Sequence, residues 1–334
     1  MAKVFTIVVP LAAPGVGDYY DLRPPVGQDW EVTELASSVS SGATVNQVPE
    51  LRAGLMTAAA LVPATIRMSG IDAADAECNI RGWAGRTSIF INNACWLRLT
   101  NVEAGAITVS VTCKLINKYG PGQTSSVVSG VAVLAGATAT PIIPPVGESW
   151  MISDVGSSVW TGAGTPNNMP NVTIEITGAA GLARVANGLN SRGWDKPFEL
   201  YMDHTNYITL TPAAGATIGW SAIKTRKFGL GASKVITRTL AIPVGTFVDI
   251  QPPVGEEWKI TDIGCSAALT GVAPAGLPTV TVTLRNTAGL STIAQIPAAN
   301  KGWRGPMAYY LTNTSYMRLT AVNLDIVGVS GIEI

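Results

Sequence analysis

Three acidic and three basic residues recur at matching places in this sequence, and they are the residues whose types could do chemistry. The acids each stand four residues after a tryptophan, and the cations each stand directly before a Gly-Trp pair. General acid–base or nucleophilic catalysis needs a second titratable group or a nucleophile beside the acid, and none recurs with these. We therefore predict three structural ion pairs: Glu34–Arg81, Asp154–Arg192 and Asp262–Lys301.

The remaining reactive residue types form no catalytic or metal-binding pattern. His204, the one histidine, stands where the other copies have Asn93 and Asn313, so we expect a hydrogen-bonding loop residue rather than a base. The cysteines do not recur between copies and no CxxC is present, which argues against a zinc site and indicates small buried or half-buried residues. A disulfide between two of the first three cysteines, Cys78, Cys95 and Cys113, is the open alternative. The cysteines are Cys78, Cys95, Cys113 and Cys265.

No GxSxG, HExxH, P-loop or dinucleotide fingerprint occurs either. We expect no enzyme activity, no cofactor and no metal.

The elements that would position these residues repeat three times along the chain. One signature is a turn followed by a tryptophan, Pro-Pro-Val-Gly-(Gln/Glu)-x-Trp, which ends at Trp30, Trp150 and Trp258. A basic-Gly-Trp triplet follows, which ends at Trp83, Trp194 and Trp303. An aromatic strand motif then begins 13 residues after each triplet, at Trp96, Tyr207 and Tyr316. A fixed spacing in three copies indicates one module repeated in tandem.

Short Val/Ile/Thr-rich runs separated by Gly, Pro, Asn and Ser fill each copy, which is typical of strands with one buried face. The sequence therefore predicts an all-β chain of three tandem antiparallel β-sandwiches, jelly-roll or immunoglobulin-like. We expect modules at 1–117, 123–228 and 232–334. The first copy is longer between its two tryptophans, and we expect the insertion near 50–60, where Glu50–Ala60 is also the best helix candidate.

The recurrent tryptophans allow two interpretations. Trp30, Trp150 and Trp258 begin strands, so we expect core residues whose indole N–H is satisfied at the sheet rim. Trp83, Trp194 and Trp303 follow glycine in predicted loops, where an exposed ring could instead stack on a sugar. Solvent exposure of these three rings would separate the two interpretations.

The composition narrows the class of partner. Charged residues make up only 13% of the chain, and 22 basic residues balance 22 acidic ones. Such a chain has no net field to attract nucleic acid or acidic lipid, and little charge to prevent self-association. The apolar N-terminal segment recurs inside the chain before the third turn, so we interpret it as a strand and not as a signal peptide. No apolar run reaches the length of a membrane-spanning helix.

The Pro-Pro-Val-Gly-(Glu/Gln)-x-Trp turn and the charge-poor, strand-rich style of each copy resemble small β-sandwich virion proteins of bacterial and archaeal viruses. The resemblance implies a non-enzymatic virion protein that is made in the host cytoplasm and binds other virion subunits as a homo-oligomer or lattice. Three copies favour a capsid decoration or minor capsid protein over a major capsid protein. The alternatives are a carbohydrate-binding adhesin that uses the Gly-Trp loops on a surface glycan, and a major capsid or other shell-forming subunit.

Overall fold

The computed structural model describes seventeen stretches of the chain, and every regular element in them is a β-strand. These stretches are residues 3–13, 18–39, 51–59, 64–68, 87–101, 105–120, 122–134, 138–159, 172–187, 199–212, 215–227, 234–243, 245–267, 280–286, 289–296, 308–321 and 325–334. Their strands form six four-stranded sheets in which every pairing is antiparallel. The predicted all-β, antiparallel sandwich architecture is confirmed.

Each third of the chain supplies eight strands. The first eight are β1 (Val4–Leu11), β2 (Tyr19–Leu22), β3 (Gln28–Val39), β4 (Leu51–Thr57), β5 (Ala64–Met68), β6 (Ile89–Ile91), β7 (Cys95–Asn101) and β8 (Ile107–Lys118). The next are β9 (Gly130–Leu134), β10 (Thr140–Ile142), β11 (Glu148–Val159), β12 (Val172–Gly178), β13 (Gly181–Asn187), β14 (Leu200–Met202), β15 (Tyr207–Pro212) and β16 (Ala216–Lys227). The last are β17 (Arg238–Ile242), β18 (Phe247–Ile250), β19 (Trp258–Ala267), β20 (Val280–Asn286), β21 (Gly289–Ile296), β22 (Tyr309–Leu311), β23 (Tyr316–Ala321) and β24 (Asp325–Glu333).

The strand order is the same in the three sets. In the first set one sheet has the order β1-β8-β3-β6 and the other β2-β7-β4-β5, and the second and third sets repeat both orders. Three hydrophobic clusters lie between the paired sheets, and each draws its buried residues from one set of eight strands. The alternation that predicted strands is visible in residues 107–113 of β8 and 172–176 of β12, where every second side chain is buried. We refer to the three sets as the first, second and third sandwich.

The Pro-Pro-Val-Gly motif forms the same turn in each sandwich. The backbone N–H of the residue after glycine donates to the carbonyl of the second proline at 3.0–3.2 Å, in Gln28→Pro25, Glu148→Pro145 and Glu256→Pro253. The glycines have φ of +83°, +84° and +89°, which a type II turn requires at its third residue and which glycine adopts without strain. The turn thus explains why this motif recurs.

The predicted helix near 50–60 is wrong: Leu51–Thr57 is strand β4, paired with β5 on one side and β7 on the other. Pairing on both edges and burial of most of its side chains outweigh the helix propensity of its Leu, Met and Ala residues. The segment before β4 holds no part of the insertion predicted near 50–60, because β4 begins 21 residues after Trp30, while β12 and β20 begin 22 residues after Trp150 and Trp258. The extra residues of the first copy therefore follow the start of β4.

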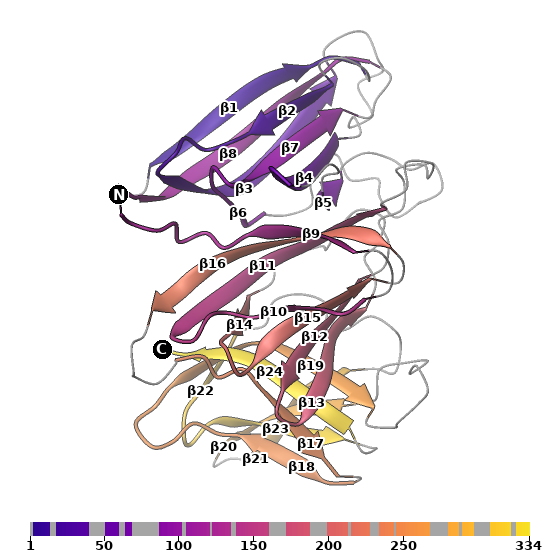
Figure 1. Ribbon diagram of the computed structural model, residues 1–334. Helices are drawn as coiled ribbons and strands as arrows, with labels where there is room; N and C mark the ends of the chain where they lie inside the picture. Colours follow the sequence, from indigo (N-terminus) through magenta and orange to yellow (C-terminus); the bar gives the residue numbers. More distant parts are fainter. Residues whose placement is uncertain are drawn as a thin grey trace.

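The three sandwiches stack one after another in chain order (Figure 1). Strands β4, β5 and β6 of the first contact β9, β11 and β16 of the second, and β12, β13 and β14 of the second contact β17, β19 and β24 of the third. In each case one side of a sandwich rests on the outer face of the next one's sheet. The chain is therefore a stack with two internal junctions.

Candidate interaction surface

A β-bulge stands at the same place in each sandwich and presents a hydroxyl. The pairing register shifts between Val32 and Glu34 in β3, and at the corresponding positions of β11 and β19. The extra residue is Thr33, Ser153 or Thr261. Its hydroxyl donates at 3.2 Å to the backbone carbonyl of the neighbouring last strand, in Thr33→Thr112, Ser153→Ser221 and Thr261→Ser330. Bulges of this kind re-aim side chains, and here they build a small polar surface.

Three hydroxyl residues lie side by side at each bulge, and we name each set a hydroxyl row. One is the bulge residue, one lies on the neighbouring last strand, and one lies on the first strand of the sandwich or directly before it. By strand register the rows are Thr6, Thr33 and Thr112 in the first sandwich, Ser129, Ser153 and Ser221 in the second, and Thr237, Thr261 and Ser330 in the third. All nine positions are Ser or Thr. Hydroxyls both donate and accept, so a row can satisfy the exposed peptide groups of a strand edge.

The first junction uses the hydroxyl row of the second sandwich in this way. The backbone N–H of Phe90, on edge strand β6, donates to Ser221 Oγ at 2.7 Å. Ser129 Oγ donates to the Phe90 carbonyl at 2.6 Å. The N–H and the carbonyl of one edge-strand residue are thereby satisfied by two hydroxyls of the next sandwich.

The second junction repeats these bonds. The N–H of Tyr201, on edge strand β14, donates to Ser330 Oγ at 2.7 Å, and Thr237 Oγ1 donates to the Tyr201 carbonyl. Thr261 Oγ1 also donates to the Glu199 carbonyl at 2.6 Å. The two junctions are therefore equivalent, and both bury the bulge residue and the last-strand residue of their rows: Ser153, Ser221, Thr261 and Ser330 are fully buried.

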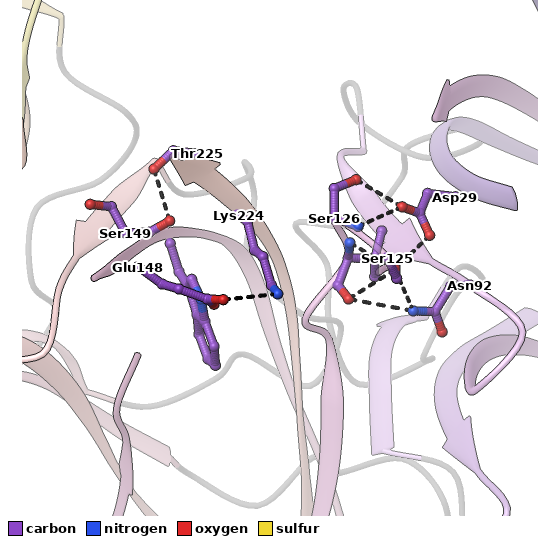
Figure 2. A network of polar contacts seen from close by, with 10 residues as sticks. Asp29, Asn92, Ser125, Ser126, Glu148, Ser149, Lys224 and Thr225 are labelled. Carbon is purple, nitrogen blue, oxygen red and sulfur yellow. Dashed lines mark hydrogen bonds and ion pairs between the residues drawn. The ribbon is translucent and has the colours of Figure 1, made fainter. Parts of the chain in front are cut away.

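A carboxylate clamps the chain where it crosses the first junction (Figure 2). Asp29, fully buried, accepts the Ser125 hydroxyl at 2.6 Å and both the N–H and the hydroxyl of Ser126 at 2.7 and 2.8 Å. Asn92 donates to Ser125 Oγ at 2.9 Å from the same side. The connection between the sandwiches is thus held against the first sandwich and is not a free tether.

The recurrent acids lie beside the hydroxyl rows, and their burial differs. Glu34 is exposed, whereas Asp154 and Asp262 are buried, because only the second and third rows are covered by a preceding sandwich. Asp154 Oδ1 accepts the Val155 N–H at 3.1 Å. Their predicted partners Arg81, Arg192 and Lys301 lie outside the described residues, so the three ion pairs stay predictions.

Burial perturbs the carboxyl of Asp262. Desolvation and, second, the nearby charge of Glu199 raise its pKa well above the usual range, opposed by a hydrogen bond from the Glu199 backbone. No described group donates to its Oδ2. The Glu199 carboxylate itself pairs with Lys259 Nζ at 2.5 Å.

The strand-opening tryptophans each bind the residue two places earlier. Trp30 and Trp258 are buried, at 9% and 6% exposure, and Trp150 is half-buried. The indole N–H donates at 2.9–3.0 Å to a side-chain oxygen of the turn, in Trp30→Gln28, Trp150→Glu148 and Trp258→Glu256. Trp83, Trp194 and Trp303 lie outside the described residues, so the glycan-stacking interpretation is untested.

His204 contacts a backbone carbonyl and two of the cysteines are buried, so these residues have structural roles in the described part of the chain. His204 Nδ1 lies 3.1 Å from the Pro144 carbonyl, as the amides of Asn93 and Asn313 bond the carbonyls of Pro24 and Pro252. Cys95 and Cys113 are buried and not disulfide-bonded, and burial raises the pKa of each thiol to about 12. Thiols of such high pKa are poor nucleophiles. Nothing is described of Cys78 or of the Cys265 side chain.

Sequence reasoning missed one recurrent ion pair. Arg98 bonds Asp21 through two nitrogens at 2.7 and 2.8 Å, and Arg318 bonds Asp249 in the same way. Each guanidinium also lies over an aromatic ring, that of Tyr19 or Phe247. This ion pair could have been found in the sequence, because an aromatic residue stands two places before each Asp and two places before each Arg. The second sandwich lacks both partners and has Pro141 opposite Thr209.

The described residues contain no group of three or more His, Cys, Asp or Glu side chains that could hold a metal ion. They also contain no helix of the length and apolarity needed to span a membrane.

Comparison with known proteins identifies no family for this chain. The chain matches no protein-family model and no curated protein. A chain in the atomic structure of Sulfolobus turreted icosahedral virus aligns over 100% of this chain and 90% of its own length, with 11% identity and a TM-score of 0.22. A score this low supports no conclusion about fold or function.

Proposed function

We propose that this protein is a non-enzymatic virion structural protein, of the capsid decoration or minor capsid type, that acts through protein–protein contacts. The observation that carries the proposal is the strand order. In each sandwich the first, eighth, third and sixth strands form one sheet and the second, seventh, fourth and fifth form the other. We infer from this order the connectivity of an eight-stranded jelly roll, an architecture shared by viral capsid proteins, lectin domains and cupins.

The two junctions favour a viral capsid protein over a lectin domain or a cupin. Both use a sheet face and a strand edge as protein-binding surfaces, with backbone groups satisfied by hydroxyls of the next sandwich. Proteins that assemble into shells need surfaces that bind other proteins, whereas a glycan site needs a local cluster of rings and polar groups. The chain thus already contains the kind of contact that the proposed function requires.

The turn valines are candidate contact points for other virion subunits. Val26, Val146 and Val254 occupy the same turn position and are 84%, 79% and 86% exposed. Val146 stays exposed although both sides of its sandwich are engaged in junctions, so these valines lie outside the stacking surfaces. Three apolar tips at equivalent places would each bind a repeated partner, and joining them in one chain raises avidity.

Purified particles from an infected host test the proposal. We expect quantitative mass spectrometry to find the chain in particles at a fixed copy number below that of the most abundant shell protein. A copy number equal to that of the shell protein would instead identify a major capsid protein. Absence from particles, together with binding on a glycan array, would support the adhesin alternative and overturn the proposal.

Variants of the three turn valines test whether the turns form the contact surface. Replacing Val26, Val146 and Val254 by serine should reduce the occupancy of added protein on particles and leave the melting temperature unchanged, because the side chains are exposed. Val133→Ser, at an exposed valine of β9, is the matched control and should bind as the wild type does. Equal binding of all these variants would remove the turns from the contact surface.

A further inference from the structure

We propose that copies of this chain join head to tail, with the hydroxyl row of the first sandwich receiving edge strand β22 of the third sandwich of a second copy. The new contact would repeat the two junctions inside the chain. The inference depends on those junctions and not on the proposed virion function, so either can fail without the other.

The first sandwich has the same bulge and hydroxyl row as the other two, but no described edge strand binds to this row. Its bulge is formed as in the other two, with Thr33 Oγ1 bonded to the Thr112 carbonyl at 3.2 Å. Its flanking valines are exposed where their counterparts are covered. Val4 is 61% exposed, but Val127 at the same register is 4% exposed. Val8 is 64% exposed, but its counterpart Val131 packs against the core of the preceding sandwich.

The third sandwich keeps the edge that would be received. Strand β22 pairs with β19 as β6 pairs with β3 and β14 with β11, so Tyr310 corresponds to Phe90 and Tyr201. Phe90 is 5% exposed, whereas Tyr310 is 64% exposed. By the same register, the N–H and carbonyl of Tyr310 point away from β19.

The apolar strands of the other sheet that would take part in the contact are also less buried in the third sandwich. Ile176 of β12 is fully buried and lies against the junction glycine Gly328. Its counterpart on β20, Leu284, is half-buried, and Gly289, the counterpart of Gly181, is exposed. The surface that covers the third sandwich in the second junction thus has an uncovered equivalent on the third.

The two surfaces that would meet, one on the third sandwich and one on the first, carry opposite charges. Glu257 stands at the sequence position of the clamp residue Asp29, and Lys3 corresponds by its backbone bond to Ser126, which Asp29 holds. Glu257 and Lys3 are both exposed. In a head-to-tail contact the carboxylate clamp would become an ion pair between copies.

Such a contact is heterologous, because the two surfaces that meet are different. Each copy has one receiving surface and one donating edge, so association extends into a filament or closes into a ring. A second copy is the occupant that fits, since the chain already supplies both halves of the contact twice.

Sedimentation velocity of the pure full chain tests the proposal. The internal junctions form at the effective concentration that a short tether gives, which is on the order of 1 mM. We therefore expect the mean mass of the wild type to rise with concentration up to this range. A chain that stays monomeric throughout would overturn the proposal.

Two variants each block one end. Val8→Lys puts an ammonium into the receiving surface and should weaken association on the order of 100-fold. Tyr310→Pro removes the donated N–H at a strand edge that faces away from the sheet, where proline is tolerated. Each variant alone should be monomeric. An equimolar mixture should form a 1:1 dimer, because each partner retains the end that the other has lost.

The controls separate this contact from other modes of association. Val254→Lys alters a valine that is even more exposed than Val8 but lies outside the stacking surfaces, and it should associate as the wild type does. Unchanged circular dichroism and melting temperature show that each variant folds. Association of either blocked variant alone, or a mixture that stays monomeric, would contradict the head-to-tail arrangement.

Discussion

At the scale of single residues, one carboxyl is held where its charge is costly. Asp262 is buried at the second junction beside Glu199, and its raised pKa means that the folded state binds its proton more tightly than the unfolded chain does. Its contribution to stability is complete below the pKa of an unfolded aspartate, about 3.9, and is lost as the pH rises through the raised folded value. Stability should therefore fall with rising pH on account of this group.

Asp262→Asn should remove that dependence. At pH 8 we expect a higher melting temperature than that of the wild type, and the difference should shrink as the pH approaches 4. Fluorescence-monitored melts at several pH values measure it. Asp249→Asn is the control: it breaks the two-nitrogen pair with Arg318 and should lower the melting temperature at pH 8. A variant that is less stable than the wild type at pH 8 would show that Asp262 is stabilising as an anion, as the predicted ion pair with Lys301 requires.

The tryptophan–turn bond gives a second prediction at this scale. Glu148 accepts the Trp150 N–H and also pairs with Lys224 at 3.1 Å, whereas the first sandwich uses Gln28 in the same role. Glu148→Gln should therefore cost little, and Glu148→Ala should cost about 1 kcal/mol, since it leaves the half-buried indole N–H without its acceptor. Urea unfolding followed by tryptophan fluorescence compares the two. Equal losses for both variants would mean that the ion pair, rather than the indole bond, carries the stability.

At the scale of elements, strand pairing and turn chemistry decide the fold, and they were visible in the sequence to different degrees. The alternation of β8 and β12 and the Pro-Pro-Val-Gly turn made the strands predictable. The segment 51–57 was not, because its Leu, Ala and Met residues favour helix and its partners β5 and β7 are distant in the chain. The bulges were invisible as well, since a bulge is a property of pairing register and leaves no residue pattern of its own.

The turn glycines allow a matched test of backbone strain. All have positive φ, but a Cβ at Gly27 would lie 2.7 Å from the Tyr119 carbonyl oxygen, whereas one at Gly255 would meet nothing within 4 Å. Gly255→Ala should cost about 1–2 kcal/mol for the left-handed conformation alone. Gly27→Ala should cost more, because the carbonyl must also shift. Hydrogen exchange in β3 and β19 reports each sandwich separately, and a larger effect at β19 would contradict the argument.

At the scale of the whole molecule, the three sandwiches are held in a repeated order by hydroxyls that satisfy strand edges. The sequence predicted the number of modules from the 13-residue spacing, yet it did not predict how they stack. The three bulge hydroxyls each stand directly before a recurrent acid, but the other six hydroxyl positions lie far apart in sequence and no motif marks them. The recurrent acids pointed to the right place, but the charge pairing assigned to them lies outside the described residues.

Removing a single hydroxyl should loosen one junction. Ser221→Ala leaves the buried Phe90 N–H without its acceptor, a loss of about 1–3 kcal/mol, so exchange of the Phe90 amide should accelerate roughly 10–100-fold. Thr112→Ala is the matched control at the same register of the first sandwich, where no described edge strand is received. In dilute solution it should leave Phe90 exchange unchanged. Unaltered exchange in Ser221→Ala would show that the junction does not depend on this bond.

The stacked arrangement has a mechanical consequence. Both chain ends lie on the same side of the stack (Figure 1), so tension applied between them would peel the junctions open from that side. Bonds that are peeled break one after another at low force, while the paired strands inside each sandwich share a load. We expect the molecule to extend under tension by separating its sandwiches while each stays folded, and to close again when the load is released.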